Sequence, residues 1–145
     1  MIEFKPCTGD HLRLITPQDD QVYDQIIHRD SFDEVSNNSF ALSCWADGVC
    51  VGAGGLRPIW TGRAIAWALL GYNSGPALVA ITKKLRFVLA TWPGNRIEMT
   101  VRESFAPGCR LALVLGFERE ARLLSFFPDG STALLYARFN HLMRE

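Results

Sequence analysis

The feature that most constrains the fold is a fully apolar run, Ala64 to Leu70, which stops at a glycine and is followed by the loop GYNSGP. A strand that is apolar on both faces has to be covered on both faces, so the run predicts a central strand of a sheet. After the loop, Ser74 or Gly75 can cap a helix with Pro76 in its first turn, where the missing N–H costs nothing. The sequence therefore predicts a strand, a tight glycine-bearing loop and a helix.

A second strand is expected after this helix. Apolar residues recur at helical spacing from Leu78 to Val88, and the helix should end before Pro93 and Gly94. The segment Arg96 to Val101 alternates polar and apolar residues, which is typical of a half-buried strand. A strand, a helix and a strand in this order imply a parallel pair with a right-handed crossover.

The chain before these elements begins with a short predicted strand, Ile2 to Lys5. Thr8 or Asp10 can cap a helix that Pro17 interrupts. A second helical stretch, Val22 to His28, has its apolar residues on roughly one side. One or two helices are therefore expected before the next strand.

A hairpin is predicted next, because strands from Ser39 to Trp45 and from Val49 to Leu56 flank Asp47-Gly48. This dipeptide is a strong signal for a type I′ turn, which needs positive φ angles. Three glycines inside the second strand indicate a bulge, or a place where another group approaches the backbone closely: Gly52, Gly54 and Gly55.

The last third of the chain predicts a helix and a closing hairpin. Ser104 can cap the helix and Gly116 can end it. Strands from Glu118 to Phe127 and from Ser131 to Phe139 flank the turn PDG. The complete order predicts one α/β or α+β domain over residues 1–145, with a mixed sheet and helices on both faces.

Composition excludes several classes of function. Fifteen basic and fifteen acidic residues cancel, so nothing favours binding to nucleic acid or to an anionic membrane. No apolar run approaches the roughly 20 residues of a membrane helix, and the first residues contain no signal core. Four scattered cysteines predict reduced thiols in a cytoplasmic protein, and three separated histidines give no spacing for a metal site.

The ordered set of elements resembles the GCN5-related N-acetyltransferase (GNAT) superfamily from about Phe4 to Phe139. The resemblance is carried by the hairpin leading into VGAGGL, the strand AIAWALL with its loop and helix, RIEMTV before a helix ending in LVLGF, and LYAR in the closing hairpin. It implies a GNAT-like, mostly antiparallel sheet of six to seven strands. It also implies acetyl-CoA as the cofactor and transfer of an acetyl group to an amine.

In that family the loop after the fourth strand binds the pyrophosphate of acetyl-CoA. The resemblance places the following residues at the cofactor: Leu69, Leu70, Gly71, Asn73, Ser74, Gly75 and Pro76. The family pattern Gln/Arg-x-x-Gly-x-Gly/Ala is only partly met, because the leading Gln or Arg is missing and Pro76 removes one amide. A helix N-terminus still attracts an anion, and the alternative is a loop that only turns the chain.

The catalytic positions of the family are largely vacant. Members often use a glutamate on the central strands as general base and a tyrosine in the last helix as general acid. The strand from Ala64 to Leu70 has no acidic residue, and Ala112 stands at the position of the tyrosine. The candidates left are Glu98 as base and Tyr72 as acid, each with the alternative of an ordinary surface role. Acetyl transfer by proximity alone needs neither.

Two functions follow from the resemblance. The first is an N-acetyltransferase that acts on a small-molecule or protein amine. The second is an inactive GNAT-like protein that binds other proteins, similar to small divergent GNAT-like proteins of tailed phages that take part in virion assembly. The expected location is the cytoplasm, or the host cytoplasm or virion for a phage protein, and the expected partners include other proteins and a second copy of the chain.

Overall fold

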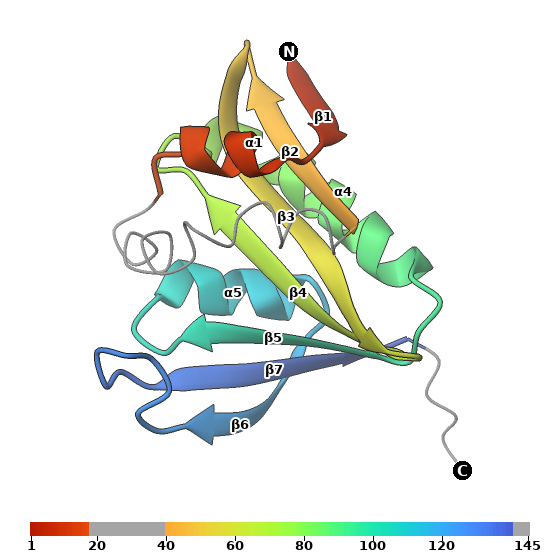
Figure 1. The fold of residues 1–145 in the computed structure, drawn as a ribbon, viewed down its shortest axis with the longest axis vertical. Coiled ribbons are helices and arrows are strands. Elements are labelled where there is room, and N and C mark those ends of the chain that lie inside the picture. Colours follow the sequence, from red (N-terminus) through yellow and green to blue (C-terminus); the bar gives the residue numbers. More distant parts are fainter. Residues whose placement is uncertain (18–39, 141–145) are drawn as a thin grey trace. The chain divides into compact units, whose positions relative to one another are not determined.

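The computed structural model describes residues 1–17 and 40–140, so the helical stretch predicted at Val22 to His28 lies outside the described residues. Figure 1 shows the elements along the chain. They are β1 (Ile2–Pro6), α1 (Gly9–Leu14), β2 (Phe40–Ala46), β3 (Val49–Trp60), β4 (Arg63–Leu70), a 3₁₀ turn (Gly75–Ala77), α4 (Leu78–Thr91), β5 (Arg96–Arg102), α5 (Ala106–Val114), β6 (Glu118–Leu123) and β7 (Ala133–Phe139).

The strands form one seven-stranded sheet in the order β1-β2-β3-β4-β5-β7-β6. The pair β4–β5 is parallel, whereas β1–β2, β2–β3, β5–β7 and β6–β7 are antiparallel. The α+β class and the mixed, mostly antiparallel sheet are therefore confirmed. No helix within residues 1–17 and 40–140 is long and apolar enough to cross a membrane.

The chain divides into two compact units. The first contains Met1–Pro58 and Ala66–Ile81, and the second contains Ile59–Ile65 and Thr82–Glu145. β4 begins in the second unit and ends in the first, and its parallel pairing with β5 covers three residue pairs, Arg63 to Ile65 with Arg96 to Glu98. The single domain expected from the sequence stays a prediction.

The predicted hairpin of the first unit is present, and it contains a bulge. Asp47 and Gly48 have φ angles of 50° and 83°, as a type I′ turn requires. The register of β2 against β3 shifts between Cys44, which pairs with Gly52, and Trp45, which pairs with Cys50. Val51 is thus the extra residue of a β-bulge, which reverses the facing of the residues that follow it.

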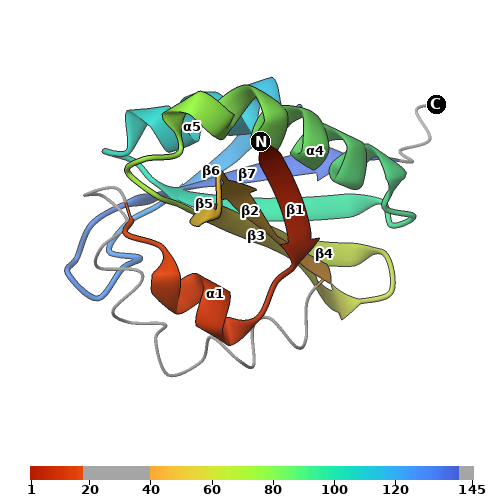
Figure 2. The ribbon, with the colours of Figure 1, turned by 90° about the horizontal axis from the view of Figure 1, so that it is seen from above.

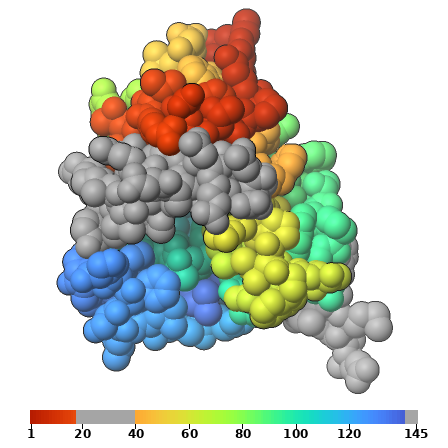
Figure 3. Space-filling model, viewed as in Figure 1, coloured from red at the N-terminus to blue at the C-terminus, as the bar shows by residue number. Residues whose placement is uncertain are grey.

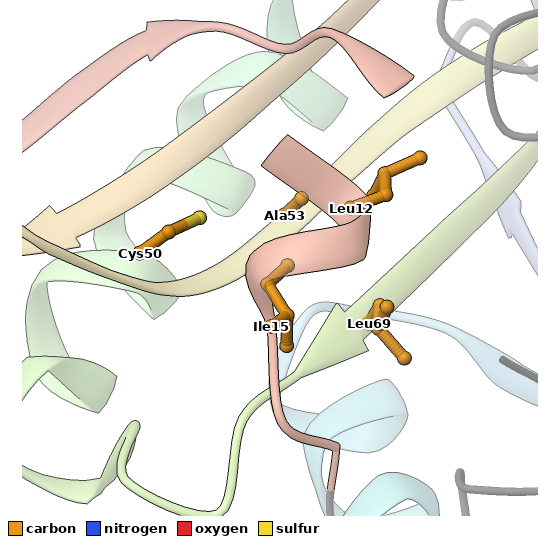
Figure 4. Packing of buried hydrophobic residues seen from close by; sticks show 5 residues of the cluster. All are labelled: Leu12, Ile15, Cys50, Ala53 and Leu69. Carbon is orange, nitrogen blue, oxygen red and sulfur yellow. The ribbon is translucent and has the colours of Figure 1, made fainter. Parts of the chain in front are cut away.

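Because of this bulge, Cys50 and Ala53 face the same side of the sheet and pack under α1. They form a core with Leu12 of α1, with Ile15 directly after this helix, and with Leu69 of β4 (Figure 4). Gly52 faces the opposite side, where a Cβ atom would lie 3.8 Å from Cδ1 of Ile81 in α4. Helical segments therefore lie on both faces of the sheet in the first unit, α1 on one and the start of α4, up to Ile81, on the other (Figure 2).

Two of the β3 glycines are required by the neighbouring strands. A Cβ atom on Gly54 would lie 2.9 Å from the carbonyl oxygen of Trp67 in β4. A Cβ atom on Gly55 would clash with the carbonyl oxygen of Phe40 and lie 2.9 Å from Cα of Ala41 in β2. The close approach expected from the sequence is therefore present, and the approaching group is the backbone of the sheet itself.

In the second unit, two arginines complete the C-terminal end of α5. Arg86 donates from Nε to the carbonyl oxygen of Val114 at 3.1 Å, and Arg138 donates from Nη1 to that of Leu115 at 2.6 Å. Gly116 follows with a φ of 89°, which confirms the predicted helix end. The last carbonyl groups of the helix thus receive cationic donors, which the helix dipole favours.

Several predicted boundaries were wrong, among them those of β3, β6 and α5. β3 continues to Trp60 rather than Leu56, and Pro58 stands beyond Leu56, the residue of β3 that pairs with Phe40 at the start of β2. β6 ends at Leu123 instead of Phe127, and the chain turns with a positive φ of 51° at Ser125. The N-cap of α5 is Phe105 rather than Ser104, and it makes no side-chain cap hydrogen bond.

Replacing Gly55 by alanine is expected to destabilise the protein by about 1–3 kcal/mol, because the new Cβ atom overpacks against β2. Chemical denaturation followed by circular dichroism measures the change. Gly75→Ala is the matched control, since a Cβ atom there would meet nothing within 4 Å. Equal stability of G55A and the unaltered protein would contradict the close packing described for β3.

Candidate functional site

The loop predicted to hold the cofactor lies in the first unit and continues directly from the core. Leu69 and Leu70, the last two residues of β4, are both buried. Gly71 then forms an isolated antiparallel bridge with Pro17, three residues after the end of α1. The loop therefore leaves the sheet from a fixed position.

Most backbone amides of the loop already have partners. The N–H of Gly71 donates to Val51 O at 2.8 Å, and the N–H of Tyr72 donates to Thr16 O at 2.9 Å. The N–H of Ser74 donates to Gly71 O at 3.1 Å. Within the described part of the chain, the amides of Asn73 and Gly75 have no hydrogen-bond partner, and Pro76 has no N–H to give.

The two loop glycines differ in whether a side chain would fit at their positions. A Cβ atom on Gly71 would lie 2.6 Å from Oδ1 of Asn73 and 2.9 Å from Val51 O, so the loop closes only with glycine there. A Cβ atom on Gly75 would meet nothing within 4 Å, and its φ is not positive. Gly75 thus leaves open space beside its own free amide.

The helix after the loop starts as a 3₁₀ turn, Gly75–Ala77, before α4 begins at Leu78. Ser74 is the N-cap and Pro76 stands in the first turn, as predicted, but the Ser74 side chain makes no cap hydrogen bond. The two free amides therefore lie at the N-terminal end of a helical segment. Such an end carries partial positive charge, which favours an anion.

Glu98, the predicted base, lies in the second unit and is held by two arginines. Arg63 donates to it from Nε at 2.7 Å and from Nη2 at 2.9 Å, and Arg96 donates from Nε at 2.7 Å. The hydrogen bonds from Arg63 lower the pKa of the Glu98 carboxyl to about 2, and those from Arg96 act in the same direction. A carboxylate of this kind accepts a proton poorly at neutral pH.

The same arginines extend the network. Arg96 also forms an ion pair with Glu120, and Arg63 stacks on Trp60 with its Cζ atom 4.4 Å from the ring centroid. Charges of opposite sign thus alternate across β4, β5 and β6. Glu98 is the central carboxylate of a structural network within the second unit.

Tyr72, the predicted acid, is 72% exposed, although its amide is fixed to Thr16. Ala112, at the position where the family resemblance places a tyrosine, is fully buried. The two candidate catalytic residues thus belong to different units: Tyr72 lies in the loop of the first unit and Glu98 in the second. No group of three metal-ligating side chains is found in residues 1–17 and 40–140.

Sequence reasoning missed the residues that hold the loop. Thr16 and Val51 accept its amides and Pro17 bridges to it, but they lie far from the loop in sequence. Their contribution is made by backbone carbonyl groups, which any residue type carries. Only the interruption at Pro17 was a visible signal, and it predicted a helix end rather than a contact.

No protein-family model matches the chain, and no curated protein sequence matches it. Solved structures do. The ribosomal-protein-S18-alanine N-acetyltransferase from Escherichia coli matches with a TM-score of 0.74 and 14% identity, covering 100% of this chain and 97% of that one. An IAA acetyltransferase from Bacillus cereus matches with a TM-score of 0.69 and 12% identity, covering 96% and 99%.

A GNAT-family acetyltransferase from Streptococcus pneumoniae also matches, with a TM-score of 0.68 and 11% identity, covering 97% of this chain and 100% of that chain. The likeness thus spans nearly the whole length of each protein. At these identities it concerns the arrangement of the backbone. The chain has the fold of the GNAT acetyltransferases.

Proposed function

We propose that the protein binds acetyl-CoA at the loop 71–76 and transfers the acetyl group to an amine. One observation carries the proposal: among residues 1–17 and 40–140, the amides of Asn73 and Gly75 have no hydrogen-bond partner at the start of a helix, and Gly75 leaves open space next to them. A phosphate group suits this place, because it has free amides at a helix N-terminus and a glycine that the packing of the protein does not require. The fold of the protein supports the same reading.

The donor set fits a pyrophosphate, with fewer donors than the family pattern implies. Asn73 and Gly75 would hold the phosphates through their N–H groups, whereas Ser74 already donates to Gly71 and Pro76 has no donor. The side chains of Leu69 and Leu70 are buried, so these residues would contribute backbone only. Acetyl-CoA supplies an acetyl group activated as a thioester.

The catalytic contribution of the chain rests mainly on holding the reactants together, which is a large effect by itself. Tyr72 is the phenol of the loop, and its exposed side chain is available to give a proton to the leaving thiolate. Glu98 stays a prediction as general base, and its ion pairs with Arg63 and Arg96 weigh against it. The amine acceptor would then lose its proton to water.

The acceptor is proposed as a small-molecule or protein amine. Among the structures with this fold, one is named for an alanine of a ribosomal protein and another for spermidine. These names describe those proteins. For this chain they suggest that an assay should contain both a protein amine and a small-molecule polyamine as acceptors. The expected location in the cytoplasm belongs to the same proposal.

A second function is favoured by a specific observation. Leu124 and Phe126, in the connection between β6 and β7, are 69% and 48% exposed, and Ala112 replaces the usual acid. An inactive GNAT-like protein that binds other proteins, as in the phage-encoded group, would combine these features. Absence of acetyl-CoA binding in a calorimetric titration, together with a stable protein complex, would favour this function over acetyl transfer.

Replacing Gly75 by aspartate is expected to weaken acetyl-CoA binding by about tenfold or more, because a carboxylate would lie beside the free amides. The stability of the fold should be kept or slightly raised, since aspartate is favourable at a helix start. Calorimetric titration and thermal unfolding measure the two effects. Gly75→Asn is the neutral control, and equal affinity of G75D and G75N would refute the site.

Replacing Glu98 by glutamine is expected to lower stability at neutral pH and to leave most of the activity. The depressed pKa of Glu98 means that its stabilisation is present above the ordinary value of 4.5 and is lost as the pH falls towards about 2. The difference between E98Q and the unaltered protein should therefore shrink over that range in urea titrations. A hundredfold loss of activity in a folded E98Q protein would instead establish Glu98 as the base.

Replacing Tyr72 by phenylalanine is expected to lower kcat by about a hundredfold if its phenol donates the proton, with little change in acetyl-CoA affinity. Since the side chain is 72% exposed, the substitution should not alter stability. Steady-state kinetics with an amine acceptor give kcat, and calorimetry gives the affinity. An unchanged kcat would remove Tyr72 from the mechanism.

A further inference from the structure

The helices of the second unit present cations without carboxylates. Neither α4 nor α5 contains an aspartate or a glutamate. The part of α4 that belongs to this unit carries the exposed cations Lys83 and Arg86, and α5 carries the exposed Arg110. Within residues 1–17 and 40–140, none of these three side chains forms an ion pair. Positive charge is therefore left unmatched on the helices.

Most described carboxylates of the second unit are paired with its strands. Four ion pairs join an acidic residue to an arginine of β4, β5 or β6: Glu98 with Arg63, Glu120 with Arg96, Asp129 with Arg102, and Glu103 with Arg122. These strand arginines are thus neutralised, whereas the cations of the helices are not. The helix cations have to be matched by water or by acidic groups of another molecule.

Two guanidinium groups meet at the C-terminal end of α5. Arg86 reaches the carbonyl oxygen of Val114 from α4, and Arg138 reaches that of the next residue, Leu115, from β7. Burial lowers the pKa of Arg138, and the positive charge of Arg86 lowers it further. Both Nη atoms of Arg86 and Nη2 of Arg138 have no partner among the described residues.

The free donors of this pair suit a carboxylate. Guanidinium groups bind carboxylates through pairs of parallel hydrogen bonds, and such charge-assisted bonds are stronger than neutral ones. The end of α5 itself carries only about half a negative charge, so the two positive charges of Arg86 and Arg138 outweigh it. An anion at this place is therefore attracted.

Apolar side chains stand among these cations. Leu113 and Val114 are 59% and 49% exposed, and Arg110 precedes them by three and four residues, so it lies on their side of α5. Phe87, the residue after Arg86, is 64% exposed and extends the apolar part along α4. Figure 2 shows both helices on one side of β5 and β7, and Figure 3 shows the later turns of α4 at the surface, in green at the right margin. We call these residues the α4–α5 surface: Arg86, Phe87, Arg110, Leu113, Val114 and Arg138.

We propose that the α4–α5 surface docks an acidic segment of a partner protein. Carboxylates of this segment bind the three arginines of the surface, and its apolar side chains cover Leu113 and Val114. Charge complementarity is the argument for this partner, because the surface has unmatched cations and no carboxylate in either helix. The inference goes beyond acetyl transfer and is independent of the loop 71–76.

Other anionic partners match the surface less well. Arg138 belongs to a strand and is only partly exposed, so the side chain of a glutamate reaches it more easily than a flat membrane surface does. Single-stranded nucleic acid binds by stacking its bases on aromatic rings, whereas Leu113 and Val114 are aliphatic. A polypeptide that carries both carboxylates and apolar groups matches both parts of the surface.

Fluorescence polarisation with a labelled peptide tests the proposal on the full chain. The probe is a peptide of about 12 residues with the repeat Glu-Glu-Leu, which carries both carboxylates and apolar groups. Arg110→Glu should weaken its binding by about tenfold or more, because the new carboxylate repels the peptide. Arg110 is exposed and makes no hydrogen bond or ion pair with another described residue, so the fold should be kept. Unchanged affinity of R110E would overturn the proposal.

Arg57→Glu is the matched control, because Arg57 is an exposed residue of β3 in the first unit and the substitution changes the net charge by the same amount. R57E should bind the peptide like the unaltered protein. An equal loss in R57E and R110E would reveal an effect of net charge and overturn the site. A peptide with lysine in place of glutamate should bind R110E more tightly than the unaltered protein, and absence of this reversal would count against the contact.

Two further variants test the other parts of the surface. Arg86→Gln keeps a donor for the carbonyl oxygen of Val114 but removes the charge, so the affinity should fall by about fivefold. Leu113→Asn removes an apolar contact from an exposed side chain and should lower the affinity by about threefold. Thermal unfolding identifies variants that fold. If both folded variants bind like the unaltered protein, the surface is wrong.

Two-dimensional NMR locates the bound peptide on the chain. The amide signals of Leu113, Val114 and Leu115 should move when the peptide is added, whereas those of Leu124 and Phe126 should stay in place. The opposite pattern would assign the docking to the connection between β6 and β7 and overturn the proposal.

Competing anions separate the possible partners. Vesicles with about 30% phosphatidylserine represent a membrane, and an oligonucleotide of about 12 nucleotides represents nucleic acid. Tighter binding of either probe than of the peptide, lost in R110E, would refute the acidic segment as the occupant. Failure of the unaltered protein to bind the peptide at about 1 mM would refute the proposal as a whole.

Discussion

The first unit depends on how closely the neighbouring backbones approach β3. Glycine at Gly54 and Gly55 lets carbonyl groups of β4 and β2 lie where any Cβ atom would collide with them. On one face of this sheet, Cys50 and Ala53 of β3 pack against Leu12 of α1. From this sheet the chain continues through Leu70 into the candidate loop. The position of the loop depends on β3, because the N–H of Gly71 donates to the carbonyl oxygen of Val51.

Most polar groups of the described residues serve the fold itself. Four arginines of the second unit bind Glu98, Glu120 or the carbonyl groups at the end of α5: Arg63, Arg86, Arg96 and Arg138. Three of the loop amides donate hydrogen bonds to the carbonyl oxygens of Thr16, Val51 and Gly71. The amides of Asn73 and Gly75, which have no partner among the described residues, lie at an exposed helix start, where water or an anion can accept from them.

The order of the elements could be predicted from the sequence, because it rests on local signals. Asp47-Gly48 produced the expected hairpin, and Gly116 ended α5 as expected. The boundaries of β3 and β6 could not be predicted, since β3 runs on past Leu56, its last pair with β2, whereas β6 stops at Leu123, opposite the first residue of β7. The candidate loop was chosen through the family resemblance, and its role as the cofactor site stays a prediction, which two amides without a partner among the described residues support.

The surroundings of the candidate residues could not be predicted. The alternation of Arg96 and Glu98 on one strand face was visible, but the contribution of Arg63 depends on the register of the parallel pair β4–β5. The capping box of α1, which pairs Thr8 with His11, was hidden for a different reason. A histidine three residues after Thr8 does not fit the usual Glu or Gln pattern, so only Thr8 or Asp10 could be suggested as a cap.

The bulge at Val51 has a consequence for how this sequence can change over evolution. The residue that lacks a partner in β2 is the one whose carbonyl receives the N–H of Gly71. Deleting one residue here would restore regular pairing of β2 and β3, but it would turn Cys50 away from α1 and withdraw the acceptor from the loop. Changes of chain length should therefore be tolerated at the exposed Asp47-Gly48 turn and purged at Val51, although both lie in the same hairpin.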